Sequence, residues 1–466
     1  MLTETANRDA RLSLWLRVRE FAVPPSMIET ATVRRRAGDW AGACAAAGID
    51  VDLNLGAAAR AHGRELAARV RADLRHLTPD LLRWQLPRIA PSGLLRPGLT
   101  ISLARYQPDG PDGRAPVHLV VRTPPAWADA GQRISLALWD GSTIENAARH
   151  HPHPHPNRRF RLDLHRHLWD DRRTDELRAR SGADRQPALD PDLVAEVPPR
   201  RPCAVDRWAA EAGILLRAEG RSTGAVAVRL GVRRRLLLEL GTDGQGLPGL
   251  RIAAASTRAG VSAPPVLPDA ATWLPPDLEL LRAGLIDADR LHPLVASALL
   301  PGHTPTGPPQ SADPPGQPRL VDCRGARHRI GLVDGVLAAL DHDPAELRRE
   351  ELLVALTGTP LPCVRAIDAA HRRPDCLTGV RERLDHGDTA GALAVVEGLL
   401  GPDATLRSGE LRDELETAAL RRISYGLYRA GLAGPLPRST PPAGHRRARD
   451  QRPHPRHASR ATVASR

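Results

Sequence analysis

The sequence predicts an α+β protein of several modules, and three observations support this fold class. Apolar side chains alternate with polar ones in several short stretches, which is the period of half-buried strands. Apolar spacing of three and four residues predicts helices between and after these stretches. Aromatic residues form only 3% of the 466-residue chain, so leucine, valine and alanine must fill the core. We therefore expect two mixed modules with short antiparallel strands, followed by a small β-hairpin and a helical region.

The first module is predicted over residues 1–183. Asp39 begins an alanine-rich helix, and residues 49–55 alternate like a half-exposed strand. Leu66, Val70 and Leu74 share one face of a further helix. The other elements expected are strands over 99–106, 117–124, 132–140 and 158–168, and a helix over 170–180.

A histidine-rich tract interrupts this module. The predicted loop 149–157 holds the His-Pro repeats, and the tract as a whole contains His150, His151, His153, His155, His165 and His167. A metal site and a pH sensor are both alternatives for such a cluster. His-Pro repetition favours an extended left-handed helix, in which alternate histidines point apart instead of converging on one ion. We therefore expect an exposed loop on the first module.

A second α+β module is predicted over residues 204–303, between linkers at 184–203 and 304–318. It should hold a helix around Trp208, two strands over 225–232 and 233–240, and helices over 276–300. The segments "AAAGI" and "LTPDLLR" of the first module have faint counterparts here, "AEAGI" and "LPPDLELLR". A degenerate duplication of the first module would explain these counterparts, but chance explains the match equally well.

The third region is predicted over residues 319–434. Residues 319–340 read as strands joined by short turns, and the Asp334-Gly335 pair suits a type I′ hairpin. A helix should follow, with Asp343 as its N-cap, Pro344 in its first position and Glu346 completing a capping box. The chain should then stay helical to about residue 432. The tail 435–466 is rich in arginine and proline, and we expect it to be disordered.

Composition excludes several kinds of site. The chain contains no lysine, so a P-loop, a protein-kinase site and a Schiff base cannot be built through a lysine side chain. The net charge is +12, of which the tail supplies +7 from eight arginines and one aspartate. Five cysteines favour free thiols in a reducing cytoplasm. No run of about 18 apolar residues exists to cross a membrane, and charges interrupt the N-terminal apolar run, so we expect no signal sequence.

Three short motifs match catalytic or binding patterns but lack the structural context that these need. "GRSTG" places Ser222 as a nucleophile, yet a strand pattern follows it where a helix is required. "GQGLPG" at 244–249, with Asp269 twenty residues later, resembles a dinucleotide loop, but Pro248 stands where the helix should run. "DVDLNLG" from Asp50 lacks the final glutamate of a calcium loop. We expect no catalytic and no cofactor-binding residues.

The third region also contains five possible metal ligands: Cys323, His328, His342, Cys363 and Cys376. Four residues separate Cys323 from His328, which is a tolerable zinc knuckle, but the other spacings are irregular and no CxxC occurs. A Cys–His nucleophile pair is a further alternative. Buried structural cysteines and surface histidines explain the pattern best, so no metal ligand is assigned, and a small zinc module around Cys323 remains the third possibility.

The segment "HGDTAGALAVVEGLLGPDATLRSG", residues 386–409, resembles the second half of an ankyrin repeat. In that likeness Gly387 and Asp388 open the outer helix, and Leu393, Val395 and Val396 pack inward. The "TPLH" signature is missing. Together with stretches such as "GDWAGACAAAGIDVDL" and "CRGARHRIGLVDGVLAALDHDPAELRREELLVALTG", the chain is similar to the long N-terminal region of uncharacterised actinobacterial ankyrin-repeat proteins. This resemblance implies a role in protein interaction and implies no catalytic residues.

These observations predict a non-enzymatic, cytoplasmic interaction or scaffold protein with unknown protein partners. The alternative is a nucleic-acid-associated protein that contacts the phosphate backbone through its arginine-rich tail. We expect no cofactor, no small-molecule substrate and no membrane partner.

Overall fold

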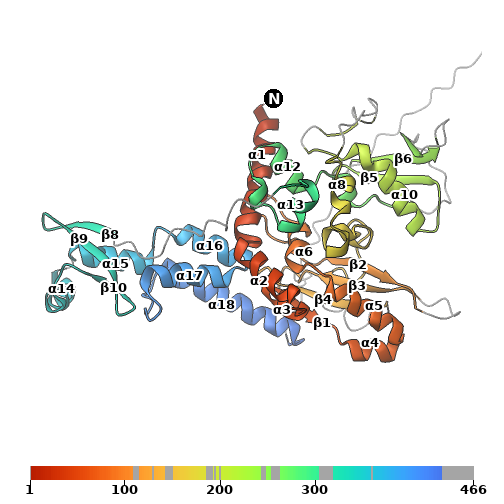
Figure 1. The fold of residues 1–466 in the computed structure, drawn as a ribbon. Helices are drawn as coiled ribbons and strands as arrows, with labels where there is room; N and C mark the ends of the chain where they lie inside the picture. The colour runs from red at the N-terminus through yellow and green to blue at the C-terminus, as the bar shows by residue number, and fades with distance from the viewer. Residues whose placement is uncertain are drawn as a thin grey trace, which may run out of the picture.

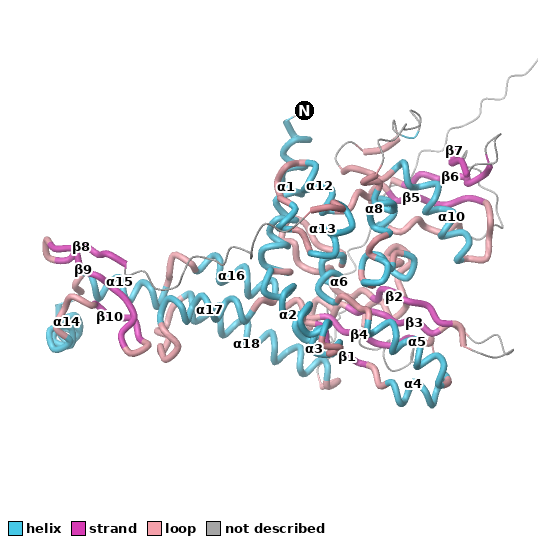
Figure 2. Tube along the Cα trace, viewed as in Figure 1, coloured by secondary structure: helices cyan, strands magenta, loops and turns pink. Residues whose placement is uncertain are grey.

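The computed structural model describes residues 2–108, 115–128, 131–141, 151–184, 193, 196–198, 201–232, 234–242, 248–252, 263–303, 319–357 and 360–432. Figure 1 shows a broad body that holds the first two modules and a narrower helical arm that ends in a small sheet. The strands gather in three separate places along this shape (Figure 2), and the α+β fold class is confirmed. Among the described residues, no helix has both the length and the apolar character needed to cross a membrane.

The first module is built on a four-stranded sheet in the order β1-β4-β3-β2, in which only β1 and β4 run parallel. Asp39 accepts a hydrogen bond from Gly42 N at 2.8 Å and begins α3 as predicted. The sequence analysis did not predict α1 and α2. The elements are α1 (Leu2–Arg17), a π-helical turn (Val18–Ala22), α2 (Pro25–Arg36), α3 (Trp40–Ala46), β1 (Ile49–Asp52), α4 (Leu55–His62), α5 (Arg64–Arg75), α6 (Pro79–Gln85), β2 (Thr100–Tyr106), β3 (Val117–Arg122) and β4 (Ile134–Trp139).

The strand predicted over 158–168 is wrong. The chain forms two 3₁₀ turns there, Leu162–Leu164 and Arg166–Leu168. The fully buried Trp169 donates its indole N–H to Leu162 O at 3.0 Å, which folds the segment back on itself. The predicted helix over 170–180 is shortened to a 3₁₀ turn, Asp171–Arg173, and α8 (Glu176–Ser181). Tertiary contacts therefore override the period-two pattern here.

The histidine tract is also only partly the exposed loop that the sequence predicts. His153 and His155 are exposed, whereas His151, His165 and His167 are buried. The ring Nδ1 of His165 donates to Arg161 O at 2.9 Å, and its Nε2 lies 3.2 Å from Glu211 of the second module. His150 lies outside the described residues. These histidines are dispersed over the interior and surface of the module and form no common centre.

The second module packs a three-stranded antiparallel sheet, in the order β5-β6-β7, against α10. Trp208 is fully buried in its core. Two later helices, α12 and α13, pack their apolar side chains into the core of the first module instead. The elements are α10 (Trp208–Ala218), β5 (Gly224–Arg229), β6 (Arg235–Thr242), β7 (Pro248–Ile252), α11 (Asp269–Thr272), α12 (Pro276–Arg282) and α13 (Pro293–Leu299). Most of the predicted linker 184–203 and all of 304–318 lie outside the described residues.

The third region begins with an antiparallel sheet in the order β10-β9-β8. Asp334 and Gly335 have φ angles of 50° and 77°, as the predicted type I′ turn requires. Five helices follow, and Asp388 caps α17 by accepting from Gly391 N. The elements are β8 (Arg319–Cys323), β9 (Ala326–Val333), β10 (Val336–Ala339), α14 (Pro344–Thr357), α15 (Pro362–Arg372), α16 (Leu377–His386), α17 (Thr389–Leu400) and α18 (Glu410–Arg429).

The ankyrin-like segment 386–409 contains one complete helix, α17, and one of the three side chains predicted to pack inward does not do so. Val396 is buried and Val395 packs beside it, whereas Leu393 is 41% exposed. The helix α17 presents Ala392, Val396 and Leu400 to the core, because these residues share one face at a spacing of four. The ankyrin resemblance itself stays a prediction. The predicted tail 435–466 lies outside the described residues.

Candidate metal centre

The structure describes two of the three short motifs in full, whereas the third lies mostly outside the described residues. Ser222 stands in a turn that leads into β5, so a strand follows it and no helix. Most of the glycine-rich motif at 244–249 lies outside the described residues, and Pro248 begins strand β7. Asp50 accepts a hydrogen bond from Tyr425 of α18 at 2.7 Å and is paired with Arg133. This aspartate therefore anchors the helical arm on the sheet.

Sequence reasoning missed a serine–histidine pair inside the first sheet. Ser102 Oγ lies 2.8 Å from His118 Nδ1, across neighbouring strands. Burial lowers the pKa of His118, so the imidazole is neutral near pH 7. Ser102 is fully buried, however, and a substrate cannot reach its hydroxyl. We interpret this pair as a structural hydrogen bond.

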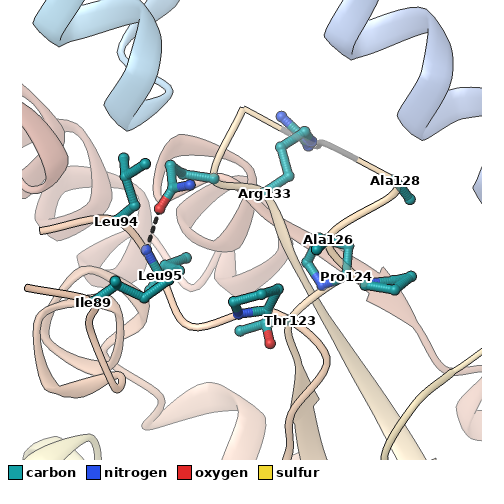
Figure 3. Close-up of a pocket in the computed structure, with 11 residues that line it drawn as sticks. Ile89, Leu94, Leu95, Thr123, Pro124, Ala126, Ala128 and Arg133 are labelled. Carbon is teal, nitrogen blue, oxygen red and sulfur yellow. Dashed lines mark hydrogen bonds between the residues drawn. The ribbon is translucent and has the colours of Figure 1, made fainter. Parts of the chain in front are cut away.

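One cavity of about 210 Å³ lies between the loop after α6 and the loop that joins β3 to β4 (Figure 3). Ile89, Leu95 and Pro124 give it largely apolar walls. Its guanidinium, from Arg133, already forms an ion pair with Asp50. Such a cavity holds few groups that would orient a substrate.

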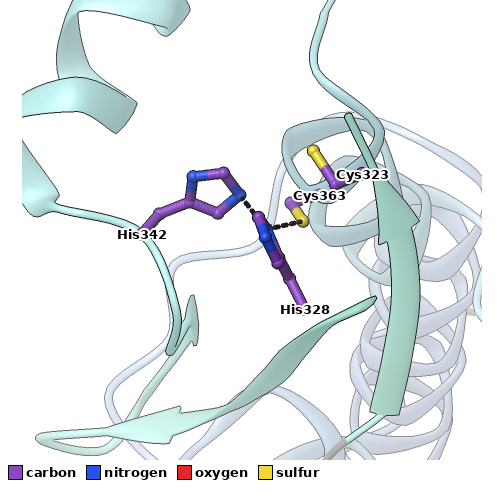
Figure 4. Close-up of side chains that lie close together, drawn as sticks. All are labelled: Cys323, His328, His342 and Cys363. Carbon is purple, nitrogen blue, oxygen red and sulfur yellow. Dashed lines mark hydrogen bonds between the residues drawn. The ribbon is translucent and has the colours of Figure 1, made fainter. Parts of the chain in front are cut away.

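Four of the five possible ligands in the third region converge in the folded chain. One donor atom each from Cys323, His328, His342 and Cys363 lies within 4.8 Å of the other three (Figure 4). The fifth, Cys376, precedes α16 and packs with a different apolar cluster. Within the described part of the chain, this is the one group of three or more such residues placed closely enough to hold a metal ion.

The β8–β9 hairpin places the first two donors. Arg324 and Gly325 form a two-residue turn with φ angles of 52° and 83°. Cys323 then pairs with Ala326, and Val321 pairs with His328. Because alternate side chains share one face of a sheet, the thiol of Cys323 and the imidazole of His328 lie on the same face. The spacing of four residues is thus the spacing of a tight hairpin.

The other two donors come from the segments that cover this face. His342 lies between β10 and α14, and its side chain is 4% exposed. Cys363 stands in the first turn of α15 and is fully buried. The helix α15 packs Val364 and Ile367 against Ile330 of the sheet, which fixes the position of Cys363. Four separate segments therefore bring two thiols and two imidazoles to one point.

The separations suit a tetrahedral ion. His328 Nδ1 lies 2.6 Å from His342 Nε2 and 3.9 Å from Cys363 Sγ. Around zinc, two nitrogen ligands lie about 3.3 Å apart and two sulfur ligands about 3.8 Å apart, given the usual zinc–ligand bond lengths. Small side-chain rotations therefore suffice to place all four donors around one ion. Two soft thiolates with two imidazoles form a donor set that Zn²⁺ prefers.

The surroundings of Cys363 disfavour a charged thiol at this position. Burial, followed by the neighbouring Cys323 thiol and the charge of Asp341, raises the pKa of Cys363 to about 11. The cysteine is therefore a neutral thiol at pH 7. A bound divalent cation would reverse this preference, because it deprotonates a coordinating thiol outright.

Comparison with protein-family models, with curated proteins and with solved structures gives no match for this chain.

Proposed function

We propose that this chain is a zinc-binding protein in which Cys323, His328, His342 and Cys363 hold one structural ion. The observation that carries the proposal is the convergence of these four donors, from four separate segments, within 4.8 Å of one another. A set of four protein ligands closes the coordination sphere of zinc, whereas catalytic zinc sites keep one position for water or substrate. The ion accordingly stabilises the fold and does not act as a catalyst.

The size of the surrounding module explains why an ion would be needed. We call residues 319–372 the end module. Its apolar core consists mainly of Ile330, Ala339, Leu361, Val364 and Ile367, packed around the two cysteines. Modules of this size bury too little apolar surface to be stable alone and commonly depend on a metal or disulfides. A zinc ion that joins β8, β9, α15 and the segment before α14 supplies that stability.

Metal analysis of the untagged full chain tests the proposal. We expect one zinc per chain, tightly bound, and its loss in Cys323→Ser. The matched control is Cys376→Ser, which removes a cysteine of the same region that lies outside the cluster. The histidine tract can bind metals weakly, so the protein should be dialysed against a mild chelator first. A chain without stoichiometric zinc, or one in which Cys323→Ser retains it, would overturn the proposal.

The interaction role expected from the sequence is a proposal of its own. It is supported by the resemblance of residues 386–409 to part of an ankyrin repeat, since ankyrin arrays form binding surfaces. The nucleic-acid alternative depends on residues 435–466. Affinity capture from native lysate, with and without nuclease, on the full chain and on a chain ending at Gly434 separates the two roles. Partners that survive both treatments support protein interaction, and recovery lost with nuclease or with the tail supports nucleic-acid binding.

A further inference from the structure

We infer that Glu346 is the outer carboxylate that orients His342 on the metal, and that Arg324 holds this carboxylate in place. The inference rests on the proposed zinc site and names a positioning residue for it. Glu346 lies in the first turn of α14, one helical turn after His342. It is not a ligand, because its carboxylate lies on the far side of the imidazole.

The geometry assigns the two ring nitrogens of His342 to different tasks. Its Nε2 faces His328 Nδ1 at 2.6 Å and so points into the ligand cluster. Its Nδ1 points away from the cluster and lies 3.8 Å from Glu346 Oε2. This separation exceeds a hydrogen bond, but a modest rotation of the half-exposed glutamate closes it. The nitrogen that does not bind the ion thus faces a carboxylate.

Histidines that bind metals commonly donate their second ring N–H to a carboxylate. That hydrogen bond fixes the tautomer, so that Nε2 presents its lone pair to the ion, and it makes the ring a more basic ligand. Glu346 supplies this acceptor. The sequence assigns Glu346 to a capping box, but Asp343 caps the helix by accepting from Ala345 N at 3.0 Å. The two oxygens of Glu346 face His342 and Arg324 instead.

Arg324 completes the arrangement from the opposite side. Its guanidinium donates to Glu346 Oε1 at 3.0 Å, and it directly follows the ligand Cys323 in the β8–β9 turn. One polar path therefore runs from a ligand in the hairpin, through Arg324 and Glu346, to a ligand beside α14. The other carboxylate close to the cluster, Asp341, is engaged with the backbone and guanidinium of Arg329. Glu346 is thus the acceptor placed for His342.

Competition between the full chain and a chromogenic zinc chelator measures the effect. We expect Glu346→Gln to weaken zinc binding by about 10- to 100-fold, the usual cost of removing an outer carboxylate. Glu346→Asp should restore most of the affinity, because it keeps the acceptor. The control for a merely structural role is Asp343→Ala, which removes the N-cap of the same helix but leaves the carboxylate. We expect its affinity to stay close to that of the unsubstituted chain.

Cobalt substitution adds a spectroscopic test. With Co²⁺ in place of Zn²⁺, Glu346→Gln should shift the visible d–d bands while keeping the thiolate charge-transfer bands, because the four ligands are unchanged. Asp343→Ala should leave both unchanged. Equal weakening in Asp343→Ala and Glu346→Gln, or unchanged affinity in Glu346→Gln, would overturn the inference while leaving the zinc site intact. Absence of stoichiometric zinc in the unsubstituted chain would overturn the proposed function itself.

Discussion

The first module buries Leu82, Ile101 and Trp169 completely within one continuous apolar core. The end module, by contrast, places two buried thiols and two imidazoles at the centre of a core with few apolar side chains. Apolar burial contributes roughly 25 cal/mol for each Å² removed from water, so the first module can be stable through packing alone. The comparison shows that one chain uses two different means of stabilisation.

The two regions also treat buried polar groups differently. In the body, the buried carboxylate of Asp277 is paired with a cation: it accepts from Arg19 at 2.5 Å and from the indole of Trp84 at 2.8 Å. Burial opposes ionisation of Glu211, but hydrogen bonds from His165 and Arg180 prevail and lower its pKa to about 2. In the end module the buried polar groups are two thiols and two imidazoles, which the proposed ion would organise. A change of metal supply should therefore affect one region and spare the other.

Removal of the metal should have the largest effect. Structural zinc contributes on the order of 10 kcal/mol to the folding of small modules. A strong chelator should therefore unfold the end module and leave the first module folded. Hydrogen exchange resolved by peptide measures this, with Cys363→Ser as a metal-independent equivalent. If both regions lost protection from hydrogen exchange together, or neither did, the metal would not stabilise the end module separately from the first module.

A cavity in the body should have the next largest effect on stability, and it should destabilise the first module instead of the end module. Trp169→Ala removes a fully buried indole and its hydrogen bond to Leu162 O, and should cost about 3–5 kcal/mol of unfolding free energy. The first module should unfold at a lower temperature in thermal unfolding, while the zinc content stays at one ion per chain. Loss of zinc in this variant would show that the end module depends on the body.

A pH-dependent effect is expected where the helical arm meets the body. Burial, followed by the charges of Arg88 and Arg83, lowers the pKa of His386 to about 4. When α16 separates from the body, His386 regains its ordinary pKa of about 6.5. The neutral ring therefore stabilises the docked arm above pH 6.5, and this stabilisation is lost as the pH falls from 6.5 to about 4.

Near pH 5 the loss should amount to about 2 kcal/mol. The charges of Asp385, Glu382 and Arg17 also face His386 and contribute to the pH dependence at this contact. Unfolding free energies measured between pH 7.5 and pH 5 test this expectation. His386→Phe should flatten the pH profile, because a phenyl ring does not titrate. The new ring can still stack on Phe21, so the packing is kept. An unchanged profile in this variant would assign the pH dependence to other groups.

The smallest effect is expected for an exposed ion pair on α18. Arg412 and Glu416 are one helical turn apart, and their side chains are 48% and 57% exposed. Glu416→Gln should change the unfolding free energy by no more than about 0.5 kcal/mol and leave zinc binding unchanged. This variant sets the scale against which the other three changes are judged.

The sequence predicted correctly those elements whose conformation depends on their own residues and immediate neighbours. The three strands β2, β3 and β4 alternate apolar side chains, and Asp334-Gly335 supplies the positive φ angles of its turn. The segment 158–168 shows the same alternation, yet the indole of the adjacent Trp169 and the carboxylate of Glu211, from the second module, contact it in its folded form of turns. A period-two pattern cannot distinguish these outcomes, because it contains no information on distant partners.

The metal cluster was partly visible in the sequence. The Cys323–His328 spacing was noted, and it is produced by the tight β8–β9 turn. His342 and Cys363 reach the same point only because the loop after β10 and the helix α15 lie over one face of the sheet, so their spacing from Cys323 matches no motif. The alternation within β8 and β9 could place only Cys323 and His328 on the same face.

The hydrogen bonds of Arg83 join parts of the chain that are synthesised at different times. This fully buried guanidinium donates to Ala22 O at 2.9 Å, to Gln132 O at 2.7 Å and to His386 O at 3.0 Å. During synthesis from the N-terminus, its last acceptor leaves the ribosome some 300 residues after Arg83 itself. Until then Arg83 has its acceptors on Ala22 and Gln132 but lacks the third one. The hydrogen bonds of this buried cation are therefore completed only when α16 has been synthesised.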